Sequence, residues 1–119
     1  MNILGVTFVG TATPRRAEME NFVEEVLRLP RLTLPDVEAQ RSALGDRSTF
    51  AVASPQGTGD TERTIGFLVV DRDEAVETLH AAGVAVGDIA VNSLWRYAHF
   101  RAPDGQLYEI VQAVEELSK

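Results

Sequence analysis

Short apolar stretches alternate with polar ones along the chain, and their spacing predicts strands and helices. Ile3 to Val9 is an apolar run of strand length. Thr13 and Pro14 suit the N-cap and the first position of a helix. Helical spacing then continues to about Leu29, where Pro30 ends the predicted helix. The apolar residues of this helix are Met19, Phe22, Val23, Val26 and Leu27.

The middle of the chain predicts short strands followed by a linker. Leu32 to Ser54 contains apolar and β-branched residues interrupted at Pro35 and Gly45, which fits two or three short strands. Phe50 to Ala53 is the clearest of them. The segment Pro55 to Glu62 reads PQGTGDTE and is polar and rich in glycine, so it is the best candidate for a linker.

The same order of elements begins again after this linker. Ile65 to Val70 is an apolar run, and Asp71 suits a helix N-cap with Glu74 three residues later. Helical spacing continues to Gly83, a residue type that commonly follows a helix. Further strands are predicted at Val84 to Val91, Leu94 to Arg101 and Leu107 to Gln112. The order predicts one α+β domain of two βαβββ halves, residues 1–56 and 63–114, joined by a linker at residues 57–62.

The last two predicted strands form a hairpin. The sequence PDG at residues 103–105 combines three residue types that favour a tight turn. With this turn, His99 lies opposite Glu109 and Tyr97 lies opposite Val111. Because side chains alternate along a strand, all four share one face of the sheet. That face therefore collects a carboxylate, an imidazole and a phenol.

Composition and charge narrow the possible functions. The chain has 119 residues, enough for one domain with its own core, and no apolar run approaches the roughly 18–20 residues that a membrane span needs. The first residues resemble a strand rather than a signal peptide, so we expect a cytoplasmic protein. The absence of cysteine excludes disulfides and thiolate chemistry. The net charge of −7, with scattered basic residues, disfavours nucleic acid as a partner and favours a cationic ligand.

Two βαβββ halves, with a PDG turn leading into a strand that carries glutamate, resemble the vicinal oxygen chelate superfamily. This superfamily contains glyoxalases, bleomycin-resistance proteins and extradiol dioxygenases. The resemblance covers nearly the whole chain and rests on FVEEVLRL (22–29), IGFLVVD (65–71), AAGV (81–84) and FRAPDGQLYEIVQ (100–112). It implies a cupped mixed sheet with helices outside, a cavity for a small molecule, and a homodimer.

The resemblance also implies where a metal ion binds, and this sequence departs from that pattern. Enzymes of the superfamily hold a divalent ion on His or Gln in the first strand of each half and on Glu in the last strand of each half. Aligning GVTFVG (5–10) with TIGFLV (64–69) places these positions at Gly5, Ala51, Thr64 and Glu109. One carboxylate is too few ligands for Mn, Fe, Ni, Zn or Mg, so we expect no metal and no other cofactor.

The candidate site residues come mainly from the hairpin. Glu109 is the candidate general base, or an anchor for a ligand amine or hydroxyl, and His99 is its candidate partner in proton transfer. Trp95 and Tyr97 offer flat surfaces for a planar ligand, and Leu107 completes the candidate ligand-binding set. Each of these residues also has a purely structural interpretation. Glu109 can be satisfied by a neighbouring Arg or Tyr, and His99 can be a packing residue with one hydrogen bond. Trp95 and Tyr97 can belong to an ordinary core strand.

Two functional hypotheses from different classes follow. The first is a metal-independent protein of this superfamily that binds a small aromatic organic molecule. The second is a cofactor-free lyase, isomerase or cyclase in which Glu109 and His99 move protons. A metal-dependent glyoxalase-like lyase or dioxygenase requires different ligand positions from those assigned above. One of Gln40, Arg41 and Ser42 is a further candidate to face the cavity, although Pro35 and Gly45 leave the register of their strand open.

Overall fold

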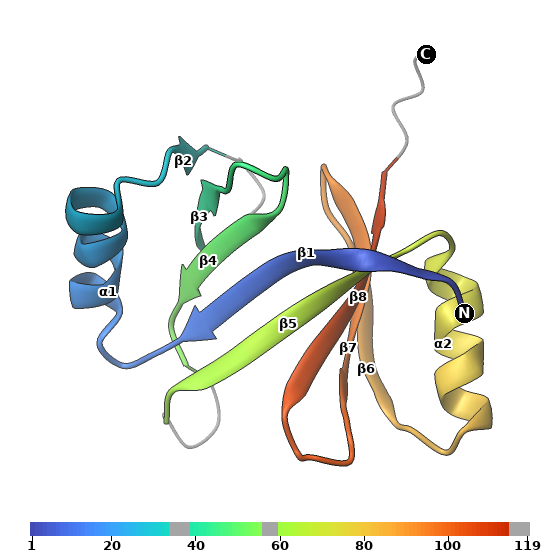
Figure 1. Cartoon of the computed structure of the whole chain (residues 1–119). Helices are drawn as coiled ribbons and strands as arrows, with labels where there is room; N and C mark the ends of the chain where they lie inside the picture. The colour runs from blue at the N-terminus through green and yellow to red at the C-terminus, as the bar shows by residue number, and fades with distance from the viewer. Residues whose placement is uncertain (34–38, 56–59, 115–119) are drawn as a thin grey trace.

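A computed structural model describes residues 1–33, 39–55 and 60–114 (Figure 1). Its elements follow the order β1 (Ile3–Ala12), α1 (Arg16–Phe22), a π-helical turn η1 (Val23–Leu27), β2 (Arg31–Leu32), β3 (Gln40–Ala43), β4 (Thr49–Ala53), β5 (Glu62–Val69), α2 (Arg72–Ala81), β6 (Val86–Val91), β7 (Trp95–Arg101) and β8 (Leu107–Ala113). Glu62, placed in the predicted linker, begins β5, while residues 57–59 of that linker lie outside the described residues.

The described strands form one mixed sheet in which the two halves mirror each other. The strand order is β2-β3-β4-β1-β5-β8-β7-β6. β1 pairs with β4 in parallel and β5 pairs with β8 in parallel, while β1 and β5 join the halves in antiparallel pairing. Figure 1 shows β1 and β5 crossing the middle of the sheet, with α1 and α2 at opposite ends. The predicted α+β fold of two βαβββ repeats is confirmed, and the sheet is not closed.

The first helix starts and ends at different residues from those predicted. α1 begins at Arg16 rather than Pro14, because the Thr13 hydroxyl accepts a hydrogen bond from the Arg15 N–H at 3.2 Å in a turn before the helix. The π-helical turn then ends at Leu27, and the next residue, Arg28, has a left-handed φ of 57°, so the helix ends before the predicted Leu29. No helix in the described ranges is long and apolar enough to cross a membrane.

The second helix packs on the outer face of the second half and builds the core there. The Asp71 side chain accepts hydrogen bonds from the N–H groups of Asp73 and Glu74, and Gly83 follows the helix with a φ of 82°, so both predicted ends are confirmed. The core cluster between α2 and the sheet consists of Val69, Ala75, Val76, Leu79, Ala98 and Ile110. Because α2 covers this face, the opposite face of the sheet is left for a cavity.

The hairpin has the predicted register. His99 pairs with Glu109, and Tyr97 pairs with Val111. Gly105 has a φ of 79°, which other residues rarely adopt, and its N–H donates to the Ala102 carbonyl at 2.8 Å. The turn residues therefore determine which side chains of β7 and β8 face each other.

Candidate functional site

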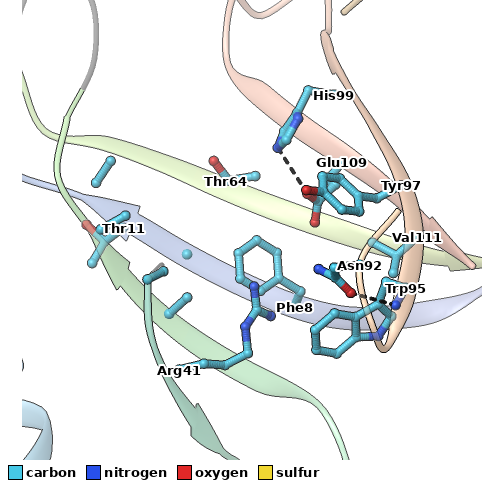
Figure 2. A pocket seen from close by; sticks show the side chains of 15 residues that line it. Phe8, Thr11, Arg41, Thr64, Asn92, Trp95, Tyr97, His99, Glu109 and Val111 are labelled. Atoms are coloured by element: carbon cyan, nitrogen blue, oxygen red, sulfur yellow. Dashed lines mark hydrogen bonds and ion pairs between the residues drawn. The ribbon is translucent and has the colours of Figure 1, made fainter. Parts of the chain in front are cut away.

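A cavity of about 400 Å³ lies on the inner face of the sheet, and both halves contribute to its walls (Figure 2). Glycine and alanine at five lining positions leave room for it: Gly10, Ala12, Ala39, Ala51 and Ala53. The larger side chains around it are Phe8, Thr11, Arg41, Thr64, Asn92, Trp95, Tyr97, His99, Glu109 and Val111. A concave site with aromatic walls and a few polar groups is the usual form of a small-molecule site.

The side chains of Glu109 and His99 contact each other in this cavity. The Glu109 Oε2 atom lies 3.0 Å from His99 Nε2. The Glu109 side chain is 11% exposed and the His99 side chain is 38% exposed, so the imidazole connects a largely buried carboxylate to solvent. Tyr97 contacts the His99 ring edge-on, with the ring centres 5.7 Å apart. The pair can accept a proton from a bound molecule and exchange it with water.

Trp95 lies at the other end of the same strand face, and Asn92 holds the turn that precedes it. The Asn92 Oδ1 atom accepts hydrogen bonds from the N–H groups of Leu94 and Trp95, at 2.9 and 2.8 Å. The Asn92 N–H in turn donates to the Trp95 carbonyl at 2.8 Å. Asn92, which the sequence analysis did not select, therefore helps to fix where β7 begins and where the indole lies.

Arg41 supplies a cation to the cavity from the first half. β3 pairs with β4 so that Arg41 lies opposite Ala51, which puts it on the cavity face. Its guanidinium carbon lies 4.6 Å from the centre of the Phe8 ring and 4.6 Å from the centre of the Trp95 ring. Its Nη1 donates to the Thr49 hydroxyl at 2.9 Å. Burial lowers the pKa of Arg41, while Glu109 and Tyr97 act in the opposite direction.

The pairing of β3 with β4 also decides which of the three candidates, Gln40, Arg41 and Ser42, faces the cavity. Gln40 and Ser42 alternate with Arg41 and are buried, and neither lines the cavity. Gln40 instead donates from Nε2 to Glu24 at 2.9 Å. Arg41 is therefore the member of the three that reaches the cavity.

Leu107 does not line the cavity, contrary to the prediction. It has the parity of Glu109, but it pairs with Arg101 beside the turn of the hairpin. On β7 and β8 the lining residues run from Trp95 to His99 and from Glu109 to Val111. The cavity therefore ends before the turn. The alternation of side chains predicts the face on which Leu107 lies, but it does not show that the cavity stops short of this residue.

The assignment of Gly5 as a metal-ligand position is also wrong. Gly5 is exposed, and β1 has two register irregularities between Ile3 and Phe8 that a sequence alignment does not reveal. Phe8 is the first residue of this strand that lines the cavity, and it pairs with Gly66, whose partner on β8 is Glu109. In the same way, Thr64 pairs with Gly10, and Gly10 pairs with Ala51 on β4. Phe8 and Thr64 are therefore the equivalent positions of the two halves.

Phe8 places an aromatic ring, which cannot bind a metal ion, at the first-strand position of the first half. A Cβ added to Gly10 would lie 2.6 Å from Phe8 Cζ, and one added to Gly66 would lie 3.0 Å from Phe8 Cβ, so the ring packs across both glycines. Of the four corrected positions, Phe8, Ala51, Thr64 and Glu109, one offers a carboxylate. In the described ranges, no group of three or more His, Asp or Glu residues could hold a metal. These residues do not fit a divalent ion.

Comparison with models of known protein families gives no match, and comparison with curated proteins gives none. Solved structures do match. A methylmalonyl-CoA epimerase from Mycobacterium tuberculosis is 16% identical with a TM-score of 0.74, over 98% of this chain and 92% of the epimerase.

Two further matches are a dioxygenase and a protein described by its superfamily. A 2,3-dioxygenase from a Pseudomonas species is 17% identical with a TM-score of 0.75, over 98% of this chain and 46% of its own. A member of the glyoxalase/bleomycin resistance protein/dioxygenase superfamily from Vibrio splendidus is 18% identical with a TM-score of 0.62, over 90% of this chain and 97% of its own. At these identities the likeness concerns the fold, and it confirms the resemblance seen in the sequence: this chain has the fold of the vicinal oxygen chelate superfamily.

Proposed function

We propose that this protein binds a small aromatic organic molecule in the cavity without a divalent metal ion. The observation that carries the proposal is the composition of the cavity walls. Trp95 and Tyr97 present aromatic surfaces, and Phe8 packs where the superfamily's enzymes place a metal ligand. A volume of about 400 Å³ lies at the small end of the range for ligand pockets, roughly 300–1,000 Å³. The ligand that fits it is a molecule of one or two fused rings.

The proposal is tested by the fluorescence of Trp95, the single tryptophan of the chain. We expect planar aromatic compounds to change this fluorescence with saturation. Val111→Phe adds bulk to the cavity wall and should weaken binding about tenfold or more, since it removes space that the ligand needs. Val91→Phe adds the same atoms at an exposed position of β6 and should leave affinity unchanged.

Two results would count against binding in the cavity. One is that no compound in a panel of neutral, anionic and cationic planar molecules changes the Trp95 signal. The other is that both valine variants, shown by thermal melting to be folded, bind with the affinity of the natural protein. The second result would place the ligand elsewhere on the surface.

A second candidate function is cofactor-free proton transfer, as in an isomerase, lyase or cyclase. The observation that favours it is the 3.0 Å contact between Glu109 and His99 inside the cavity. In such a reaction Glu109 takes a proton from a carbon or oxygen of the substrate, and the proton passes to His99 or returns to the substrate at another atom. One structural neighbour is a methylmalonyl-CoA epimerase, which shows that this fold can support an isomerase.

Glu109→Gln should separate binding from catalysis. We expect it to lower the rate of deuterium incorporation from D2O into the tightest-binding compound by about 100-fold or more, because general base catalysis typically contributes that much. The dissociation constant should change little, since glutamine keeps the shape of the side chain. Glu62→Gln, which removes a carboxylate outside the cavity, is the matched control. An unchanged exchange rate in Glu109→Gln would remove Glu109 from the mechanism.

A further inference from the structure

We propose that the aromatic ligand is an organic acid, whose carboxylate binds Arg41. This inference rests on the proposed function and specifies its ligand class. Figure 2 shows the Arg41 guanidinium beside the Phe8 ring, with the His99 and Glu109 pair on the far side of the cavity. The cavity therefore has a cation at one side and a proton-transfer pair at the other.

The hydrogen-bonding capacity of Arg41 is largely unused. A guanidinium has five N–H donors, and in Arg41 Nη1 donates to Thr49. Neither Nε nor Nη2 has a hydrogen-bond partner among the residues that the structure describes, and Nε is buried. Because Nε is buried, a ligand cannot reach it, whereas Nη2 is not among the fully buried atoms. Leaving the donors of a largely buried cation unsatisfied is costly, so an anion that accepts from Nη2 recovers free energy. A carboxylate matches the planar donors of arginine better than a neutral amide or an amine does.

The two aromatic rings hold Arg41 in place for this role. Phe8 and Trp95 both lie 4.6 Å from its guanidinium carbon, and they come from different halves of the chain. Contacts with ring faces orient a guanidinium without using its N–H donors, which all lie in its plane. The arrangement therefore keeps the cation inside the cavity with donors free for a ligand.

The charges of the cavity also favour an anion. Glu109 is the single acidic residue of the described lining, and His99 already contacts its carboxylate at 3.0 Å. Arg41 forms no ion pair with any acidic residue in the described ranges. Arg41 is thus a cation of the cavity that contacts no carboxylate of the described residues, although the whole chain carries −7. The lining residues argue for an anionic ligand, opposite to the expectation from net charge.

The test compares three compounds that share one ring system: 2-naphthoate, 2-naphthamide and 2-naphthylmethylammonium. We expect the natural protein to bind naphthoate about tenfold or more tightly than naphthamide, as measured by Trp95 fluorescence, with the ammonium compound weakest. Arg41→Gln should remove the preference for naphthoate and leave the affinity for naphthamide within about twofold. Arg41→Lys keeps the charge and should keep part of the preference. Arg96→Gln, which removes an exposed arginine of β7, should change neither affinity.

The outcomes separate this inference from the function on which it rests. If naphthamide binds the natural protein as tightly as naphthoate, the carboxylate proposal fails and binding of an aromatic molecule still stands. If folded Arg41→Gln keeps the full preference for naphthoate, another group recognises the carboxylate and the assignment of Arg41 fails. If none of the three compounds binds, both proposals fail. The comparison in the natural protein decides the ligand class even if Arg41→Gln does not fold.

Discussion

The triple variant Phe8→His, Ala51→Glu and Thr64→His is expected to bind one Zn²⁺ per chain, whereas the natural protein is expected to bind none. Together with Glu109 the variant has two imidazoles and two carboxylates around one cavity. Gly66 pairs with both Phe8 and Glu109, and Gly10 pairs with both Thr64 and Ala51. These pairings put the four positions at equivalent places in the two halves. Such a ligand set suits zinc.

The expected gain in zinc affinity is about 1,000-fold or more, which corresponds to tenfold for each added ligand. Isothermal titration with zinc chloride measures it, and elemental analysis gives the stoichiometry. The control variant Phe8→Leu, Ala51→Leu and Thr64→Leu changes the same positions without adding metal ligands, and it should stay metal-free. If the four-ligand variant folds and takes up no zinc, the assignment of Phe8 as the partner position of Thr64 is wrong.

Replacing Ile110 with alanine is expected to lower the free energy of unfolding by about 3 kcal/mol, within the range of about 2–5 kcal/mol for large aliphatic residues in protein cores. Ile110 is 1% exposed and belongs to the cluster that packs α2 against the sheet. The loss combines the transfer free energy of the side chain with the cavity left behind, because close-packed neighbours relax only in part. Urea unfolding monitored by circular dichroism measures the change.

Ile89→Ala is the matched control for this prediction. Ile89 also lies on a strand of the second half, but it is 50% exposed. The control should cost no more than about 1 kcal/mol, which is the span of strand propensities. If both variants lose the same stability, the cluster under α2 is not the main core of this half.

Most of the fold follows from local signals in the sequence. The second helix has an N-cap at Asp71 and a glycine after its end at Gly83, and both features have the expected backbone geometry. The PDG turn fixes the register of β7 and β8, so the pairing of His99 with Glu109 follows from counting residues. The start of α1 was not predictable from Thr13, since the same hydroxyl can cap a helix or close the turn before it.

The site was harder to predict because it depends on the register between distant strands. The alignment that placed Phe8 on Phe67 assumed an unbroken β1, whereas this strand has two irregularities before Phe8. Arg41 could not be separated from Gln40 and Ser42, since its direction is set by pairing with β4. The prediction that Leu107 lines the cavity failed for a different reason. The alternation of side chains gives the face of a strand but not the extent of a cavity.

The central claim is that an aromatic molecule occupies the cavity beside Trp95. The protein has a single tryptophan, so its indole N–H gives one peak in a ¹⁵N-edited NMR spectrum. We predict that this peak moves with saturation as 2-naphthoate is added, with the same midpoint as the fluorescence change, and that Val111→Phe shifts the midpoint to higher concentration. A Trp95 peak that does not move while the compound binds elsewhere, or binds not at all, would contradict the account.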